Sequence, residues 1–142
     1  MDLQYEGVKN SRQKSAISSA LGKCVCFLPF WVNEVTVICG QTPSEADSAL
    51  EMCALPQYRK LTVYVYESFY SLSKKGQMDA MQHEVFHALT WPLYDWVRTT
   101  LLSPLEKQND ALYQALSTRF DELNEALTED IRIVFEKSQK EV

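Results

Sequence analysis

The chain is poor in glycine, proline and histidine, and it has no concentrated block of positive charge. Four glycines and five prolines among 142 residues exclude a collagen-like chain, and the 46% share of apolar residues excludes a largely disordered one. The formal net charge is −5. Nucleic-acid binding usually needs a clustered basic surface, and the basic residues that cluster near the N-terminus, Lys9, Arg12 and Lys14, are few. We therefore expect no nucleic-acid partner.

Long apolar runs are also absent. The longest, Cys24–Val32, is interrupted by Pro29 and is too short to cross a bilayer. Residues 1–14 lack the apolar core of a secretory signal. The sequence therefore predicts a cytoplasmic protein with no membrane partner.

The cysteines lack the spacing of a common zinc knuckle. One residue separates Cys24 from Cys26, whereas the usual site contains Cys-x2-Cys, and no matching pair follows at Cys39 and Cys53. Because no export signal is present, the four side chains are predicted to be reduced structural thiols.

The length suits a single domain over residues 1–142, and the hydrophobic pattern predicts the α+β class. Alternating apolar and polar residues, many of them β-branched, indicate strands, whereas a proline after a threonine indicates a helix start. The elements expected in the first half are a helix from Tyr5 to Leu21, a strand at Val35–Cys39, a short helix from Thr42 to Cys53 and a strand at Leu61–Tyr66.

The second half is predicted to be helical. Helix-forming residues run from Gln77 to Trp91, where Pro92 is expected to break or kink the helix. A second helical stretch is expected at 93–102, followed by a long amphipathic helix from Pro104 to Lys137. This order predicts a small mixed sheet packed against the first of these helices and the long C-terminal helix.

Both histidines of the chain lie in one motif within the predicted helix 77–91. The motif is His83-Glu84-Val85-Phe86-His87, the H-E-x-x-H pattern. Two imidazoles at i and i+4 on one helix face can share a zinc ion, and the intervening glutamate can accept a proton from a water molecule. The motif therefore predicts a zinc site with Glu84 as general base.

The helical wheel separates these histidines from the apolar side of the helix. The residues expected to face the core are Met78, Met81, Val85 and Leu89. His83 and His87 point almost to the opposite side, whereas a histidine buried in the core would lie on the apolar stripe. The wheel therefore favours metal binding over two ordinary core histidines.

The third ligand must be an acid or a cysteine, because no third histidine exists and Leu93 occupies the position of the metzincin ligand. Asp130 borders the apolar stripe of the C-terminal helix, whereas Glu129 lies with its outer glutamates. Asp95, eight residues after His87, is a further possibility. The acids that the C-terminal helix offers are Glu122, Glu125, Glu129, Asp130 and Glu136.

Residues 30–137 resemble the phage metallopeptidase family, a group of small gluzincin-like proteins related in outline to SprT-like and minimal zincin folds. The resemblance rests on Trp31 with Val35-Thr36-Val37, on Pro56-x-Tyr58-Arg59-x-Leu61-Thr62-Val63, and on His83-Glu84-x-x-His87-Ala88-Leu89. It implies a minimal zincin-like fold, a Zn²⁺ cofactor and a host-cytoplasm location. Through the late element Thr128-Glu129-Asp130-Ile131 it implies Glu129 as third ligand, with Asp130 next.

The expected function is hydrolysis of a peptide or protein substrate. Zinc polarises the scissile carbonyl and lowers the pKa of its bound water, and Glu84 accepts the proton. The strand Leu61–Tyr66 is the candidate substrate-binding edge. The residues that could stabilise the developing negative charge are Tyr64, Tyr66, Tyr94, Tyr113 and Arg98.

Two other functions remain open. One is a catalytically inactive interaction protein with a zinc site on a zincin scaffold, forming a homodimer through its long C-terminal helix. An intact Glu84 argues against it, because a structural site has no use for a general base. The other is DNA-linked proteolysis of the SprT kind, which the net charge of −5 disfavours.

Overall fold

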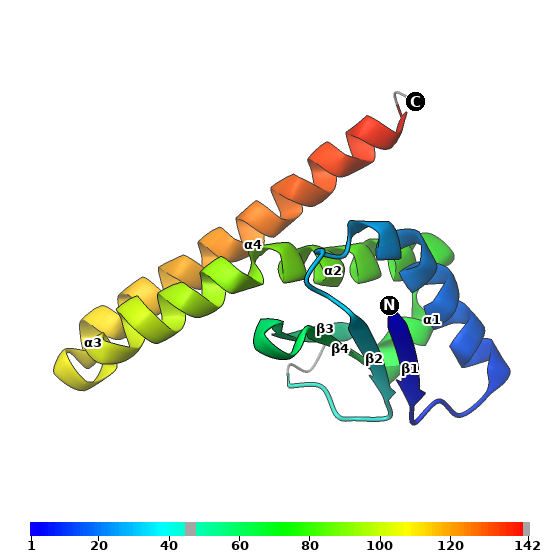
Figure 1. Ribbon diagram of the computed structural model, residues 1–142, viewed down its shortest axis with the longest axis horizontal. Coiled ribbons are helices and arrows are strands. Elements are labelled where there is room, and N and C mark those ends of the chain that lie inside the picture. The colour runs from blue at the N-terminus through cyan, green and yellow to red at the C-terminus, as the bar shows by residue number, and fades with distance from the viewer. Residues whose placement is uncertain (45–47, 141–142) are drawn as a thin grey trace. The chain divides into compact units, whose positions relative to one another are not determined.

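The computed structural model describes residues 1–44 and 48–140. The chain divides into two compact units, Met1–Leu89 and Thr90–Val142, whose elements are labelled in Figure 1. The assignment of residues 1–142 to a single domain stays a prediction.

The first unit is built on a four-stranded mixed sheet in the order β1-β2-β4-β3. β1 pairs with β2 and β2 with β4 in parallel, whereas β3 pairs with β4 antiparallel. The predicted α+β class and small mixed sheet are therefore confirmed. The strands are β1 (Asp2–Glu6), β2 (Glu34–Cys39), β3 (Leu50–Leu55) and β4 (Lys60–Val65).

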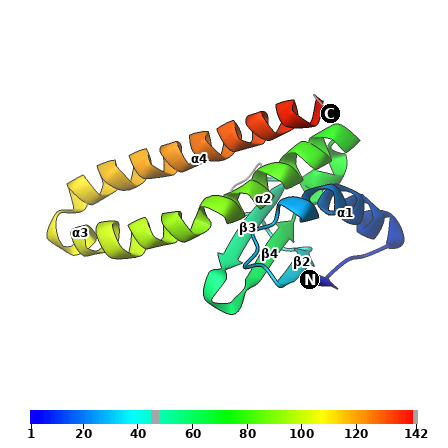
Figure 2. The same cartoon turned by 45° about the horizontal axis from the view of Figure 1, so that its top comes forward.

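One face of the sheet is buried because apolar residues alternate with polar ones along its central strands. Val35 and Val37 of β2 and Leu61 and Val63 of β4 are fully buried, whereas the residues between them are partly exposed. α1 (Ser11–Cys24) and the first part of α2 (Lys74–Trp96) lie over one side of the sheet (Figure 2). The predicted strands at Val35–Cys39 and Leu61–Tyr66 are thus confirmed to within one residue at each end.

The helix expected from Tyr5 to Leu21 begins later, as α1 (Ser11–Cys24). The Asn10 side chain caps it by accepting a hydrogen bond from the Gln13 N–H at 2.9 Å. The preceding residues form β1, because pairing with β2 supplies their backbone hydrogen bonds. Gly7 follows β1 at φ 69°, where an added Cβ would lie 2.3 Å from the Cys39 carbonyl oxygen.

The short helix expected from Thr42 to Cys53 is wrong. Residues 50–55 form β3, whose Leu50 and Ala54 are buried, and residues 45–47 lie outside the described part. Helix-forming residues such as Glu51 and Met52 adopt the strand conformation because β4 offers them an antiparallel partner.

A tight turn, η2 (Pro56–Tyr58), joins β3 to β4 and ends at Arg59 in the left-handed region, φ 58°. The Arg59 side chain donates from Nε to the Trp31 carbonyl at 3.1 Å. The Arg59 carbonyl accepts hydrogen bonds from the backbone N–H groups of Asn33 and Glu34. This residue therefore ties the β3–β4 turn to the segment that enters β2.

The helix that carries the histidines is longer than expected. α2 (Lys74–Trp96) runs through Pro92 and continues as the π-helical segment η4 (Val97–Leu102). A proline ring removes one backbone hydrogen bond from a helix without always ending it. The helix therefore does not break at Pro92, and the alternative expectation of a kink stays a prediction.

The long helix expected from Pro104 is divided in two at Asn109, which lies between α3 (Ser103–Gln108) and α4 (Asp110–Lys140). Asn109 has an extended backbone and caps α4, because its side-chain oxygen accepts a hydrogen bond from the Leu112 N–H at 3.1 Å. No helix of the described residues is both long and apolar enough to cross a membrane.

Within the second unit, the end of α2 and η4 contact α4 through polar side chains. Tyr94 donates to Asp121 at 2.8 Å, and Arg98 donates to Asp121 at 2.9 Å and to Ser117 at 2.8 Å. The Tyr94 and Phe120 rings stack with centroids 5.3 Å apart. These contacts fix the register of the two helical segments.

Candidate metal centre

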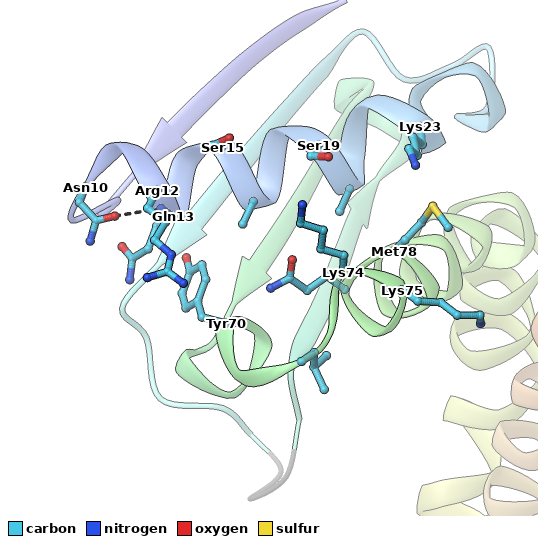
Figure 3. Close-up of a pocket in the computed structure, with 14 residues that line it drawn as sticks. Asn10, Arg12, Gln13, Ser15, Ser19, Lys23, Tyr70, Lys74, Lys75 and Met78 are labelled. Atoms are coloured by element: carbon cyan, nitrogen blue, oxygen red, sulfur yellow. Dashed lines mark hydrogen bonds between the residues drawn. The ribbon is translucent and has the colours of Figure 1, made fainter.

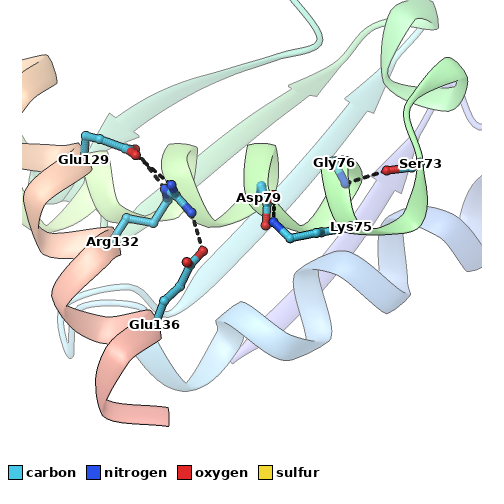
Figure 4. Close-up of polar contacts among 7 residues, drawn as sticks. All are labelled: Ser73, Lys75, Gly76, Asp79, Glu129, Arg132 and Glu136. Carbon is cyan, nitrogen blue, oxygen red and sulfur yellow. Dashed lines mark hydrogen bonds and ion pairs between the residues drawn. The ribbon is translucent and has the colours of Figure 1, made fainter. Parts of the chain in front are cut away.

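The first turn of α2 is capped by Ser73. Its Oγ accepts a hydrogen bond from the Gly76 N–H at 3.1 Å, and its carbonyl accepts one from the Gln77 N–H at 2.8 Å. Figure 4 shows this cap beside the ion pair between Lys75 and Asp79. Because the cap and the buried face fix the rotation of the helix, they also fix the direction of its polar side chains.

His83 and His87 converge, as the motif predicts. Their Nε2 atoms lie 3.0 Å apart, and their rings meet edge to face with centroids 4.7 Å apart. Both side chains are partly buried. The helix therefore brings two imidazole nitrogens to one point, which is the arrangement that a shared metal ion requires.

The distance between these nitrogens suits a metal ion. At a zinc–nitrogen distance of about 2.0–2.1 Å and a tetrahedral angle, two imidazole nitrogens lie roughly 3.3 Å apart. The observed 3.0 Å separation of the Nε2 atoms needs only a small side-chain adjustment to reach that value. The donors present therefore fit Zn²⁺.

The apolar side of α2 agrees with the helical wheel in part. Met81 and Val85 are buried, as expected, but the Leu89 side chain is 41% exposed. Phe86, which the wheel did not place on the stripe, is buried and contacts Phe27, with ring centroids 6.2 Å apart. The buried face is therefore rotated toward Phe86.

Glu84 lies partly buried on α2, close enough to the end of β4 to act electrostatically on Tyr66. Burial raises the pKa of Tyr66 to about 12, and interaction with Glu51 and the charge of Glu84 add to the rise. Tyr66 is therefore a buried, neutral hydroxyl that is hydrogen-bonded to Glu51 and feels the charge of Glu84. From the sequence, Tyr66 was only one of several candidates for stabilising negative charge. Nothing in the sequence indicated that Glu51 interacts with it.

The predicted acidic ligands Glu129 and Asp130 belong to α4 in the second unit. Both carboxylate oxygens of Glu129 accept hydrogen bonds from Arg132, at 2.6 and 2.8 Å. Arg132 also pairs with Glu136 (Figure 4). Asp130 is exposed. Glu129 is therefore engaged in a bidentate ion pair that the sequence did not predict.

Two other sequence candidates already have side-chain partners, because Tyr94 and Arg98 are both bound to Asp121. Asp95 is exposed on α2 in the second unit. Tyr64 is partly exposed on β4, where it stands opposite Glu51 of β3. Of these tyrosines and Arg98, Tyr66 is the one on which Glu84 acts electrostatically within the first unit.

The expectation that Leu61–Tyr66 forms a sheet edge is wrong. Its strand, β4, pairs with β2 on one side and with β3 on the other. Among the described residues, the edges of the sheet are β1 and β3. A peptide that adds to this sheet would therefore pair with β3 or β1.

The pKa of Tyr94 gives an alkaline stability prediction. Burial first, then the hydrogen bond to Asp121, raises this pKa to about 12. Because the neutral phenol is favoured in the folded state, this stabilisation is complete below pH 10 and is lost as the pH rises toward 12. We expect Tyr94→Phe to weaken this alkaline loss, measured as the unfolding free energy against pH. An unchanged profile would show that Tyr94 does not ionise on unfolding.

No family model, curated protein or solved structure matches this chain.

Proposed function

We propose that the protein is a zinc-dependent metallopeptidase whose site is formed by His83, Glu84 and His87 with an acid of α4. The observation that carries the proposal is the convergence of the two histidine Nε2 atoms at 3.0 Å, with Glu84 at the next position of the helix. A structural zinc site is usually closed by four Cys and His ligands. Two histidines beside a glutamate instead suit a catalytic site with an open position.

The third ligand that we favour is Glu125 of α4, which would complete a donor set of two imidazoles and one carboxylate with His83 and His87. Helical periodicity supports this choice. His87 precedes Tyr94 by seven residues and shares its helix face, and Glu125 follows Asp121 by four residues and shares that face of α4. Tyr94 and Asp121 are hydrogen-bonded, so these two faces are complementary.

Glu129 and Asp130 remain the alternatives. The resemblance implies Glu129, but its two oxygens are held by Arg132 at 2.6 and 2.8 Å. If Glu129 bound zinc, its bidentate ion pair with Arg132 would have to break. Such pairs are among the stronger hydrogen bonds in proteins. We therefore place Glu125 first, on the helix-face argument given above.

In the proposed reaction, bound zinc supplies Lewis acidity for the scissile carbonyl and for an attacking water. Glu84 accepts the proton of the water and delivers it to the leaving amine. Tyr66, a neutral donor with its pKa raised to about 12, is the candidate for stabilising developing negative charge. The substrate is a peptide or protein segment, and we expect it to pair with β3, a sheet edge.

A second candidate function is an interaction protein that keeps the zinc site without catalysis. The exposed apolar residues of α4 favour it, because such side chains are suited to a second helix. A homodimer through α4 is then expected, visible as twice the chain mass in solution. Those exposed residues are Leu112, Leu116, Leu123, Leu127 and Val134.

Metal content tests the site directly. Protein purified without chelator and reloaded with zinc should contain about one zinc per chain. His83→Ala and His87→Ala should each remove nearly all of it, because two ligands of one helix cannot hold zinc tightly when one is lost. A wild-type protein that takes up no zinc would refute the metallopeptidase and the zinc-bearing alternative together.

Single substitutions on α4 distinguish the acidic residues that could be the third zinc ligand. We expect Glu125→Ala to lose zinc, while Glu129→Ala and Asp130→Ala keep it. Glu122→Ala is the matched control, because Glu122 is an exposed α4 acid paired with Arg119 at 2.8 Å. Zinc loss in Glu129→Ala or Asp130→Ala alone would instead identify that residue as the ligand.

A further inference from the structure

A groove in the first unit carries positive charge although the chain as a whole is acidic. Its volume is about 910 Å³, and it lies between α1 and the segment that leads into α2. Four of its lining residues are cations and none is an acid, whereas the formal net charge of the chain is −5. The cations are Arg12, Lys23, Lys74 and Lys75.

Most of this charge is not neutralised by ion pairs. Lys75 pairs with Asp79 at 2.6 Å. Within residues 1–44 and 48–140, no acidic side chain lies within ion-pair distance of Arg12, Lys23 or Lys74. Figure 3 shows the side chains of Arg12 and Lys74 in the space between the two helices. Cations from α1 and from the start of α2 therefore line the same groove.

Helix α2 adds to the positive potential. It begins at Lys74, so its first turn lines the groove. The dipole of a helix favours an anion at its N-terminus, although the Gly76 and Gln77 N–H groups of this turn already donate to Ser73. Neutral donors accompany these charges: the amides of Asn10, Gln13 and Gln77, and the hydroxyls of Ser15 and Ser19.

The rest of the lining is apolar and leaves room for an organic group. Ala16, Ala20, Leu72 and Met78 contribute small or flexible apolar surface, and Tyr70 contributes an aromatic ring. Pockets of roughly 300–1,000 Å³ accommodate ligands of the size of a nucleotide. We call these five residues the apolar floor of the groove, and an acidic peptide would make less use of them.

We propose that this groove binds a phosphate-bearing small molecule, with Arg12 and Lys74 holding the phosphate and the apolar floor receiving the organic part. Arg12 offers a planar pair of donors to phosphate oxygens, and Lys74 offers a point charge at the helix start. The site is separate from His83 and His87, neither of which lines it. It therefore stands whether or not the chain is a peptidase.

The test is a calorimetric titration of the full chain with pyrophosphate, ADP and an acidic hexapeptide. We expect both phosphate compounds to bind and Arg12→Gln/Lys74→Gln to weaken their binding at least about tenfold, the effect of losing one charge-assisted contact. The control is Lys107→Gln/Arg119→Gln, a pair of exposed cations on α3 and α4. Both double variants change the net charge by the same amount, from −5 to −7.

Each outcome decides the proposal. Tighter binding of ADP than of pyrophosphate supports the role of the apolar floor, whereas equal binding would overturn that role and leave a site for the phosphate alone. Equal weakening in the two double variants would overturn the proposal, because binding would then follow net charge only. Binding of the hexapeptide without the phosphates, or no binding at all, would overturn it as well. Far-UV circular dichroism checks that the surface variants keep their fold.

Discussion

Glu84→Gln is expected to abolish zinc-dependent peptide cleavage while leaving about one zinc per chain bound. The amide keeps the size of the carboxylate but cannot accept a proton from water. General acid–base groups contribute about 10²–10⁴-fold to a rate, and we expect a loss of about 10³-fold. The measurement is cleavage of a pool of quenched fluorescent peptides by zinc-loaded protein, with zinc content determined on the same samples.

Glu67→Gln is the control for Glu84→Gln. The Glu67 side chain is 75% exposed and pairs with Lys9 at the surface, so its substitution should change neither cleavage nor zinc content. Unchanged cleavage by Glu84→Gln would rule out Glu84 as the base. Zinc binding without cleavage of any peptide by the wild type would instead favour the interaction protein.

Phe69→Ala should cause the largest loss of stability in the first unit. Phe69 is fully buried in the turn η3 (Glu67–Ser71), and its ring meets Tyr70 edge to face at 5.6 Å. Truncation of a buried phenylalanine costs about 3–5 kcal/mol, because it removes apolar burial and leaves a cavity. Since domains are stable by only about 5–15 kcal/mol, we expect a marked fall in the urea midpoint.

Phe30→Ala is the matched control for this stability prediction. The Phe30 side chain is 93% exposed, so the same chemical change should alter the unfolding free energy by no more than about 0.5 kcal/mol. Equal effects of the two substitutions would show that Phe69 is not part of the core. The comparison therefore tests the packing of η3 against the sheet and helices.

The strands could be predicted from the sequence only where local pattern and tertiary pairing agree. Val35, Val37 and Val63 belong to alternating β-branched runs, so β2 and β4 are visible in isolation. Residues 50–55 contain good helix formers and become β3 only through pairing with β4. β1 likewise depends on a partner some thirty residues away in the chain. Long-range pairing of this kind leaves no local sequence signal.

The candidate metal site likewise has a part that local sequence predicts and a part that depends on tertiary structure. A spacing of four residues is local, so the helix converts the positions of His83 and His87 directly into the 3.0 Å approach of their Nε2 atoms. A ligand from α4 depends on the rotation of a second helix and on competing ion pairs. The bond between Arg132 and Glu129 cannot be read from either residue alone. The acidic ligand from α4 therefore stays a prediction, whereas the approach of the two histidines is observed.

The order of the strands implies an order of assembly. Leu55 and Lys60 pair across the short turn that Arg59 closes, and local hairpins of this kind form within about 1–10 μs. β1 pairs with β2 across a much longer segment that contains α1, and non-local pairings form later than local hairpins. We therefore expect β1 to join after the β3–β4 hairpin. Until it does, the open side of β2 offers unpaired backbone groups to another unfinished chain, and we expect the newly synthesised protein to be prone to aggregation.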